Sequence, residues 1–332
     1  MHDGFSTTAR IAGLGRFLPE KIVTNHDLEK IVDTSDEWIT TRTGIKERRM
    51  VAEGEALVDL VVRAGKAALE DAGVEAEAVD LLIVATATPD QPIPATSAIA
   101  QPKLGVVNAA CFDLSAACSG FTYSLNVARQ FIATGTAKNV LVIGAECLTR
   151  YTNWNDRKTC VLFGDGAGAV LLQPSPAGEG ILQIDWRTDG TWADFIAMPG
   201  GGSRFPPGSQ ESLDQGLPFI TMRGNETFKV AVRAMTGLSL DLLKRAGIQP
   251  GDLDLFIPHQ ANLRIIQAVG KRLKLSDEQV YTNVQRFGNT SAASIPLAMV
   301  DAVEDGRLKR GDLLLVTAFG GGLTWGSALI RF

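Results

Sequence analysis

An internal repeat constrains the fold of this chain more than any other feature of its sequence. Residues 71–87 (DAGVEAEAVDLLIVATA) align without a gap to residues 245–261 (RAGIQPGDLDLFIPHQA), at an offset of 174 residues. Each copy follows a segment, 57–68 or 228–242, in which apolar residues recur with the spacing of one helix face. The sequence therefore predicts that one helix–strand unit occurs twice.

The elements that follow each copy are also repeated. Gly73 and Gly247 lie where each helix would end with a left-handed residue. The apolar stretches pair as 81–85 with 255–257, 140–144 with 313–317, and 168–172 with 326–330. Such stretches are typical of strands buried on both faces. We therefore expect an α/β fold of two duplicated βα halves stacked in layers, although two α/β segments can also look alike by chance.

The repeat and the breaks between its parts predict the domain organisation. We expect an N-terminal half over residues 1–184, a connector with a flap over 185–224, and a C-terminal half over 225–332. The connector is rich in glycine and proline, which interrupt regular elements. The first half has an extra loop near 151–158, and a second irregular segment, 88–105, contains four prolines. An ordered loop of that length is usually functional or part of an interface.

The composition is that of an ordinary soluble protein: 45% of the residues are apolar, 21% are charged, and the net charge is −5. A nucleic-acid-binding protein would normally have a basic excess, so that class is disfavoured. The four cysteines form no C-x-x-C pair, which argues against a metal site and against a disulfide framework. No signal peptide and no membrane-length apolar run is evident, so we expect a reduced, cytoplasmic protein.

Cys118 is the candidate nucleophile. It lies among small residues just before a segment with helical periodicity, and so near the start of a predicted helix. The helix dipole favours a thiolate there and can lower a cysteine pKa from about 8.5 toward about 7. The alternative interpretation, a small buried hydrophobe, fits Cys111, Cys147 and Cys160 better.

His259 and Asn289 are the candidate partners of Cys118. His259 follows the apolar stretch 255–257, and ligands of α/β folds gather at the carboxyl ends of strands. By itself it would rather be a half-buried structural histidine, and its position after the strand favours a functional role. Asn289 precedes a second helical pattern and could be an ordinary helix N-cap. Matching the glycines after the two helices predicts Asn289 opposite Cys118, and a cysteine, a histidine and an amide could carry out acyl transfer.

Two glycine-rich segments are candidates for binding loops. Residues 164–168 precede an apolar strand rather than a helix, which argues against dinucleotide binding and predicts a tight turn. Residues 320–322 follow the stretch 313–317. Glycine there allows close backbone approach and exposes N–H groups that an oxyanion could use.

Several motifs occur together in this chain. They are Asp36-Glu37-Trp38-Ile39 with Arg42-Thr43-Gly44-Ile45, Ser115-Ala116-Ala117-Cys118-Ser119-Gly120-Phe121, Phe163-Gly164-Asp165-Gly166-Ala167-Gly168-Ala169, Pro258-His259-Gln260-Ala261-Asn262, Gly288-Asn289-Thr290-Ser291, and Phe319-Gly320-Gly321-Gly322-Leu323-Thr324-Trp325-Gly326. Over essentially the whole chain they resemble the β-ketoacyl-acyl-carrier-protein synthase III family of condensing enzymes, which have the thiolase-like fold. The resemblance implies this fold and an acyltransferase that begins type II fatty acid synthesis.

The resemblance also implies catalytic roles. Cys118 would carry the acyl group, and the backbone N–H groups of Cys118 and Gly321 would form its oxyanion hole. His259 and Asn289 would bind the malonyl thioester carbonyl and stabilise the enolate that decarboxylation leaves. No cofactor is implied, because acyl-CoA is itself a substrate.

The partners that the resemblance implies are acyl-CoA, malonyl-acyl-carrier protein and a second copy of the chain. The coenzyme A tunnel would be formed by Thr34, Trp38, Arg42, Arg157, Gly224, Phe228 and Asn262. The carrier protein would dock on the basic residues Arg264, Lys271, Arg272 and Lys274. Without the resemblance, that basic run is equally a solvated helix face, and Trp38 a partly buried helix aromatic.

Related activities are separated by their residues. Elongating synthases use a second catalytic histidine and thiolases a second cysteine, and neither has a counterpart here. An enzyme of secondary metabolism with another primer stays open, because Leu323 stands where the family commonly has phenylalanine. Ile93, in the segment that reaches toward the acyl pocket across the family's dimer, also leaves the primer open. A non-catalytic subunit is disfavoured, because all three catalytic residues are present.

Overall fold

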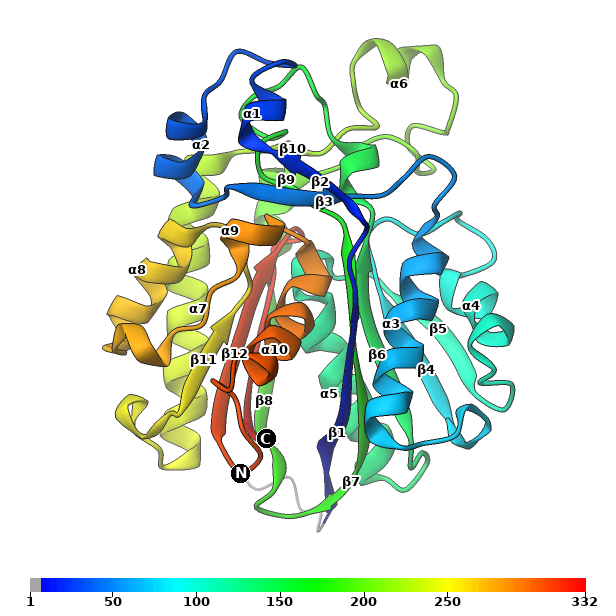
Figure 1. Cartoon of the computed structure of the whole chain (residues 1–332), viewed down its shortest axis with the longest axis vertical. Coiled ribbons are helices and arrows are strands. Elements are labelled where there is room, and N and C mark those ends of the chain that lie inside the picture. The colour runs from blue at the N-terminus through cyan, green and yellow to red at the C-terminus, as the bar shows by residue number, and fades with distance from the viewer. Residues whose placement is uncertain (1–6) are drawn as a thin grey trace.

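The computed structural model describes residues 7–332, and its larger sheet belongs to the first half of the repeat (Figure 1). The strand order is β1-β7-β6-β4-β5. The strands are β1 (Thr7–Phe17), β4 (Leu81–Ala85), β5 (Ala110–Leu114), β6 (Val140–Glu146) and β7 (Gly166–Pro176). β4, β5 and β6 run parallel, and β7 is antiparallel to both its neighbours. Every residue of β4 and β6 is buried, as predicted for strands covered on both faces.

The second sheet repeats the first. Its order is β11-β12-β13-β8, with β11 and β12 parallel and β13 antiparallel to β12 and β8. The strands are β8 (Gly180–Thr188), β11 (Leu255–Pro258), β12 (Leu313–Gly320) and β13 (Thr324–Arg331). Where the first sheet has β5, the second has one bridge between Phe256 and Val280. The same order and directions confirm the predicted duplication.

The predicted match between β6 and β12 sets Val140 against Leu313 and is wrong by one residue. In the first sheet Val140 pairs with Leu172. In the second sheet the counterpart of Leu172 is Ile330, and Ile330 pairs with Leu314. The counterpart of Val140 is therefore Leu314. β6 and β12 therefore match at an offset of 174, the same as residues 71–87 and 245–261. The final residue of β6 thus corresponds to the final residue of β12.

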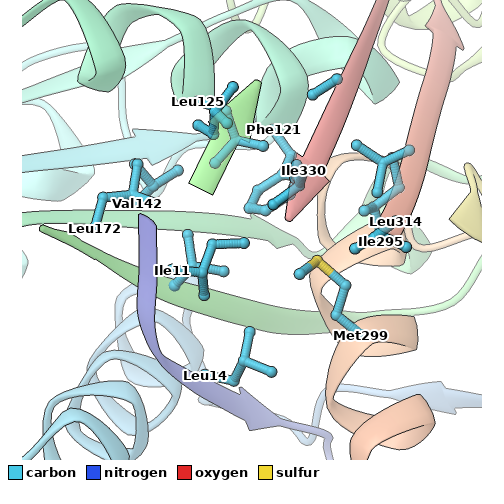
Figure 2. Close-up of a cluster of buried hydrophobic side chains, with 14 of the residues drawn as sticks. Ile11, Leu14, Phe121, Leu125, Val142, Leu172, Ile295, Met299, Leu314 and Ile330 are labelled. Carbon is cyan, nitrogen blue, oxygen red and sulfur yellow. The ribbon is translucent and has the colours of Figure 1, made fainter. Parts of the chain in front are cut away.

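Helices separate and cover the two sheets, which gives five layers (Figure 1). α5 (Gly120–Ala133) and α10 (Ser294–Glu304) lie between the sheets and share one core with both of them. In Figure 2 that core contains Ile11, Leu14, Val142 and Leu172 of the first sheet, Leu314 and Ile330 of the second, and Phe121, Leu125, Ile295 and Met299 of the two helices. α3 (Leu57–Ala72) and α4 (Thr96–Leu104) cover the outer face of the first sheet, and α7 (Gly224–Ala246) and α8 (Leu263–Leu273) cover that of the second.

The repeated helices end as their glycines predict. α3 ends at Gly73 with φ 62° and α7 at Gly247 with φ 70°, both left-handed. The irregular segment predicted over 88–105 is wrong in its second part, because α4 forms there. The carboxylate of Asp113 on β5 accepts the N–H groups of Thr96 and Ser97, at 2.7 and 2.8 Å. This cap lies 16 or more residues away, outside any local pattern.

Short elements cap the end of the two halves at which the candidate site lies (top of Figure 1). They are β2 (Lys21–Thr24), α1 (Asn25–Leu28), α2 (Asp36–Thr43), β3 (Glu47–Met50), η3 (Leu148–Tyr151), η4 (Gly190–Phe195), β9 (Ile196–Ala197), α6 (Gln210–Asp214), β10 (Thr221–Met222) and α9 (Val284–Phe287). The remaining short turns are η1 (Ala76–Ala78), η2 (Ala117–Ser119), η5 (Pro250–Asp252), η6 (Asp277–Gln279) and η7 (Ser291–Ala293).

The predicted boundary after residue 184 falls within β8. β8 pairs with β13 from Gly180 to Thr188 with one bulge, so residues 180–184 already belong to the second sheet. The predicted extra loop of the first half lies between η3 and β7 and contains no helix or strand beyond Tyr151. Within residues 7–332, no helix combines the length and the apolarity needed to cross a membrane.

Candidate active site

Cys118 lies in the turn η2, directly before α5, as the sequence predicts. Ala117 before it has a left-handed φ of 46°. The end of β12 packs against this turn: a Cβ atom on Gly320 would lie 2.6 Å from the Cys118 backbone nitrogen. Only glycine allows this approach, so the glycine loop and the cysteine turn are built for each other.

Burial raises the pKa of the Cys118 thiol to about 12. The charge of Glu146 acts in the same direction, and a hydrogen bond from the Ser291 side chain opposes both. Cys118 is half-buried and lines a cavity. The expected lowering of its pKa is therefore contradicted, because desolvation disfavours the thiolate. Its resting form is the neutral thiol.

His259 follows β11 and is 3% exposed. Its backbone N–H donates to the Thr317 carbonyl at 2.8 Å, which ties it to β12. Its Nδ1 lies 2.6 Å from the Ser294 hydroxyl oxygen at the start of α10. Burial lowers the pKa of His259 to about 3, so the imidazole is neutral at physiological pH.

Asn289 is 5% exposed and held on three sides. Its N–H donates to the Leu162 carbonyl at 2.8 Å, and its carbonyl accepts the Gly164 N–H at 3.1 Å. Its Oδ1 accepts the backbone N–H of Ser291 at 2.9 Å. A backbone N–H can only donate, so the side-chain oxygen faces Ser291 and the NH2 group is left to donate elsewhere.

The turns before α5 and α10 correspond to each other. Ala117 in η2 and Ser291 in η7 both have left-handed φ values, 46° and 49°, and each helix starts three residues later. β6 of the first half packs against η7 of the second, and β12 of the second against η2 of the first. The candidate site therefore lies where each half meets the other.

The predicted placement of Asn289 opposite Cys118 is wrong. At the shared offset of 174, Ala292 corresponds to Cys118, and Asn289 precedes it by three residues. The prediction matched the glycines after the helices, but α5 has 14 residues and α10 has 11. The predicted tight turn at 164–168 is also wrong beyond its start, because β7 begins at Gly166.

Cys118 and Asn289 each line a cavity, whereas His259 lines neither of the two. The smaller, of about 320 Å³, is lined by Ala87, Thr88, Ser115, Ala116, Ala117, Cys118, Leu148, Phe163, Ile196, Ala197, Met198, Ile220, Ser291, Gly321, Gly322 and Thr324. The larger, of about 580 Å³, is lined by Trp38, Arg42, Thr43, Lys158, Val161, Leu162, Met222, Gly224, Asn225, Thr227, Phe228, Lys229, Ala261, Asn262, Arg264, Ile265 and Asn289. Leu162 faces the larger and the adjacent Phe163 the smaller, so the two share a wall.

Gly321 and Cys118 line the same cavity, as an oxyanion hole made of their N–H groups requires. Thr324 fixes the glycine loop to the cysteine turn. Its hydroxyl donates to the carbonyl oxygen of Ala116 at 2.9 Å, and its own carbonyl accepts the Ser119 hydroxyl at 3.0 Å. Both partners of the predicted hole are thereby held in one unit.

Five of the seven residues predicted for the coenzyme A tunnel line the larger cavity: Trp38, Arg42, Gly224, Phe228 and Asn262. Thr34 and Arg157 are not part of its wall. The guanidinium groups of Arg42 and Arg157 lie 4.4 and 5.2 Å from the centre of the Trp38 ring. Lys158 and Lys229 also line this cavity, although no motif indicated them.

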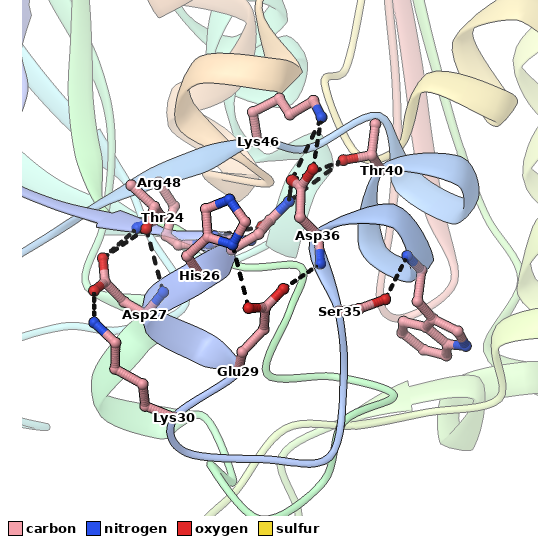
Figure 3. Close-up of polar contacts among 12 residues, drawn as sticks. Thr24, His26, Asp27, Glu29, Lys30, Ser35, Asp36, Thr40, Lys46 and Arg48 are labelled. Atoms are coloured by element: carbon pink, nitrogen blue, oxygen red, sulfur yellow. Dashed lines mark hydrogen bonds and ion pairs between the residues drawn. The ribbon is translucent and has the colours of Figure 1, made fainter.

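A polar network holds α2, which carries Trp38 (Figure 3). The Ser35 hydroxyl accepts the Trp38 N–H at 3.1 Å, and the Asp36 carboxylate accepts the Asn25 amide at 2.9 Å and Lys46 at 3.0 Å. The Asn25 side-chain oxygen accepts the fully buried Arg48 guanidinium at 2.9 Å. The motif around Trp38 therefore anchors the helix to β3 from beneath.

The four basic residues predicted to dock a carrier protein lie on α8 or at its end, but they do not line one cavity. Arg264 lines the larger cavity, with its guanidinium 5.7 Å from the Phe228 ring centre. Lys271 and Lys274 line a separate cleft, whose wall follows α8 from Leu263 to Lys274. Arg272 lines neither. Seven residues of helix separate Arg264 from Lys271, about 10 Å along the axis.

Sequence reasoning missed Ser291 and Ser294, which contact Asn289 and His259, and Glu146, which contacts Ser291. Glu146 accepts the Ser291 hydroxyl at 2.9 Å across 145 residues of sequence. Ser291 and Ser294 lie within five residues of Asn289, and their pairing with two catalytic candidates shows only in the tertiary structure. Glu146 ends an apolar strand, where a carboxylate is unexpected, and that was its one signal.

The two stacked halves, with a cysteine turn inserted between them, define a thiolase-like, acyl-transferring condensing enzyme. The model of 3-oxoacyl-[acyl-carrier-protein] synthase III matches residues 112–190, and that of the C-terminal part of this enzyme matches residues 243–332. The chain belongs to this family. It is 53% identical to the β-ketoacyl-[acyl-carrier-protein] synthase III of Caldanaerobacter subterraneus, over 98% of both chains.

Solved structures agree with this assignment. The 3-oxoacyl-[acyl-carrier-protein] synthase III of Aquifex aeolicus has a TM-score of 0.91 and 48% identity, covering 98% of this chain and all of its own. A priming β-ketosynthase of a polyketide biosynthetic pathway has a TM-score of 0.89 and 34% identity, over 97% and 96% of the two chains.

Proposed function

We propose that the protein condenses an acyl-CoA primer with malonyl-acyl-carrier protein and so begins type II fatty acid synthesis. The observation that carries this proposal is the shared wall of the two cavities. Cys118 lines the smaller cavity, Asn289 lines the larger, and Ser291 connects the two. A thioester extended along the larger cavity would bring its carbonyl to the wall where the nucleophile lies.

The reaction has two stages. In the first, the Cys118 sulfur attacks the thioester carbonyl of acyl-CoA, the carbon–sulfur bond to coenzyme A breaks, and the thiol proton passes to the departing thiolate. In the second, malonyl-carrier protein loses carbon dioxide, and its enolate carbon attacks the acyl-cysteine. The cysteine sulfur leaves as thiolate and regains a proton, and 3-oxoacyl-carrier protein is released. The N–H groups of Cys118 and Gly321 would hold the first oxyanion, and His259 with Asn289 the enolate oxygen.

Charge in the larger cavity fits the phosphates of coenzyme A. Arg42, Lys158, Lys229 and Arg264 all line it. The Trp38 ring offers a stacking surface for adenine, with Arg42 and Arg157 already over it. Arg157 and Thr34 would contact coenzyme A only at the outer edge of the larger cavity, because neither residue lines it.

Acetyl is the primer that we propose first. The smaller cavity is mostly apolar and its 320 Å³ would also accept a longer or branched acyl group. Leu323 does not itself line this cavity and is fully buried in the neighbouring core. The polyketide-pathway relative keeps a second candidate function open, a priming ketosynthase of secondary metabolism with another acyl group.

We further propose that the protein acts as a homodimer in the cytoplasm. β5 is the edge strand of the first sheet, and an unpaired edge can continue into a second copy. The segment before α4 carries Ile93, which is 86% exposed, and Val107 beyond α4 is 59% exposed. Apolar side chains this exposed beside an open edge fit a partner surface.

Intact mass after incubation with a panel of acyl-CoAs tests the proposal. We expect one acyl adduct per chain, mapped to Cys118, with acetyl-CoA among the fastest donors. Malonyl-carrier protein should then remove the adduct and yield the 3-oxoacyl product. Acylation without product would favour the second candidate function, and an adduct on Cys111, Cys147 or Cys160 would contradict the nucleophile assignment.

A further inference from the structure

Glu146 is a fully buried carboxyl group at the end of β6. Its Oε1 accepts the Ser291 hydroxyl at 2.9 Å and the Ala87 N–H at 3.2 Å. Its Oε2 accepts the hydroxyls of Thr86 and Thr88 at 3.2 and 2.7 Å. All of these donors are uncharged, so the carboxyl group is buried at a cost in desolvation that no ion pair among them offsets.

Ser291 connects this carboxyl group to the reaction site. Its hydroxyl donates to Glu146, its backbone N–H donates to Asn289, and it lines the same cavity as Cys118. Donated to the Cys118 sulfur instead, the proton of this hydroxyl would favour the charged form of that sulfur. A serine hydroxyl has one proton, so Glu146 and an anionic sulfur compete for it.

The other half of the repeat shows that the fold does not require this polar pair. By strand register, Glu146 corresponds to Gly320, because Glu146 pairs with Gly166 as Gly320 pairs with Thr324. Ser291 corresponds to Ala117, in the same left-handed conformation. The end of β12 and the turn η2 thus pack together although neither Gly320 nor Ala117 has a polar side chain.

We infer that Ser291 is a further catalytic residue, a shared donor whose hydroxyl bonds to Glu146 while Cys118 is a thiol or an acyl thioester, and to the Cys118 sulfur while that sulfur is anionic. The inference rests on the proposed function, in which the sulfur is anionic when it attacks acyl-CoA and again when condensation releases it. Glu146 is the alternative acceptor and acts on Cys118 through Ser291.

Alkylation of Cys118 by iodoacetamide tests the inference without any substrate. The rate at a fixed pH above about 7, where Glu146 is ionised, follows the thiolate fraction when resolved by peptide mapping. Glu146→Gln removes the competing charge, so we expect alkylation about two- to tenfold faster than in the unmodified protein. Ser291→Ala removes the donor and should slow alkylation by a similar factor. Thr86→Val is the matched control: it removes a hydrogen bond to Oε2, leaves Oε1 with Ser291, and should leave the rate unchanged.

A double variant decides whether Glu146 acts through Ser291. In a double-mutant cycle, Glu146→Gln should accelerate alkylation much less in the Ser291→Ala background than alone. Equal acceleration in both backgrounds, or no acceleration alone, would overturn the inference. Alanine fits position 291 because Ala117 adopts the same conformation, and Ser291→Gly is a second donor-free variant should the first fold poorly.

The acyl-CoA half-reaction supplies a second readout. Single-turnover acylation by acetyl-CoA should follow the same order of rates as alkylation in the four variants. If the unmodified protein takes up no acyl group, the proposed function fails, while the alkylation cycle still decides the role of Ser291. If acylation and condensation proceed but the cycle shows no coupling, only the shared-donor inference fails.

Discussion

The Ser294 hydroxyl oxygen lies 2.6 Å from Nδ1 of His259, at the first residue of α10. The same hydroxyl oxygen accepts the backbone N–H of Gln260 at 3.3 Å. Its own proton can therefore be donated to Nδ1, which leaves the single proton of the neutral imidazole on Nε2. That tautomer is the one that an enolate oxygen requires of His259.

His259→Ala and Asn289→Ala should each lower malonyl decarboxylation by about 10²–10³-fold, because each removes one donor to the enolate oxygen. Ser294→Ala, which removes only the support of the tautomer, should lower it about tenfold. Release of labelled carbon dioxide measures all three. Cys118→Ala is the control and should retain residual decarboxylation without forming an acyl-enzyme. Normal decarboxylation in His259→Ala would assign the histidine to Cys118 as a general base instead.

The raised pKa of Cys118 predicts a steep pH dependence. Below a pKa of about 12 the thiolate fraction rises tenfold per pH unit, so alkylation of Cys118 should still be rising at about pH 9. Measuring the rate from about pH 6 to about pH 9 checks this. A plateau near neutral pH would show that the helix start outweighs burial.

Arg264 and Lys271 should differ in their effect on the carrier-protein step. Arg264→Glu reverses a charge in the wall of the larger cavity and should slow turnover with malonyl-carrier protein about tenfold or more, with a weaker salt dependence. Lys271→Glu, about two helical turns away, should have the smaller effect. Rates at several salt concentrations measure both. Equal losses with acyl-CoA alone would indicate a coenzyme A contact rather than a docking contact.

Gly320→Ala should abolish most activity, because its Cβ would lie 2.6 Å from the Cys118 backbone nitrogen. The turn would have to move, and with it the sulfur and the N–H groups of the oxyanion hole; a loss of about 10²-fold in acylation is expected. Gly237→Ala on α7 is the matched control, since nothing lies within 4 Å of its added Cβ. Acylation rate and melting temperature should be measured together.

Glu146 also predicts how stability varies with pH. Burial raises its pKa from 4.5 to about 7, so the folded chain holds a proton that the unfolded chain has already lost. This contribution to stability is complete below about pH 4.5 and is lost as the pH rises through about 7. Glu146→Gln should therefore flatten the fall in melting temperature over this range. An unchanged slope would show that Asp165, whose pKa burial raises to about 6, carries the effect.

Local patterns predicted the repeated helices and strands well, because apolar spacing and terminal glycines act within a few residues. They failed where distant contacts decide. The cap of α4 comes from Asp113, which lies on β5. The surroundings of the Cys118 sulfur depend on β12 and η7. Alignment by the glycines after the helices misplaced Asn289, since helix length differs between the halves.

Because the two turns correspond, the second half contains a position equivalent to that of the nucleophile, but without a reactive side chain. Ala292 occupies that position. Glu146 ends β6 beside the turn of Ala292, as Gly320 ends β12 beside the turn of Cys118. The same backbone arrangement, a strand end packed against a left-handed turn, occurs twice, so the side chains of the two copies can differ without a change of fold. One copy keeps small residues around a sulfur, and the other gathers the hydroxyl, amide and carboxyl groups that act on it.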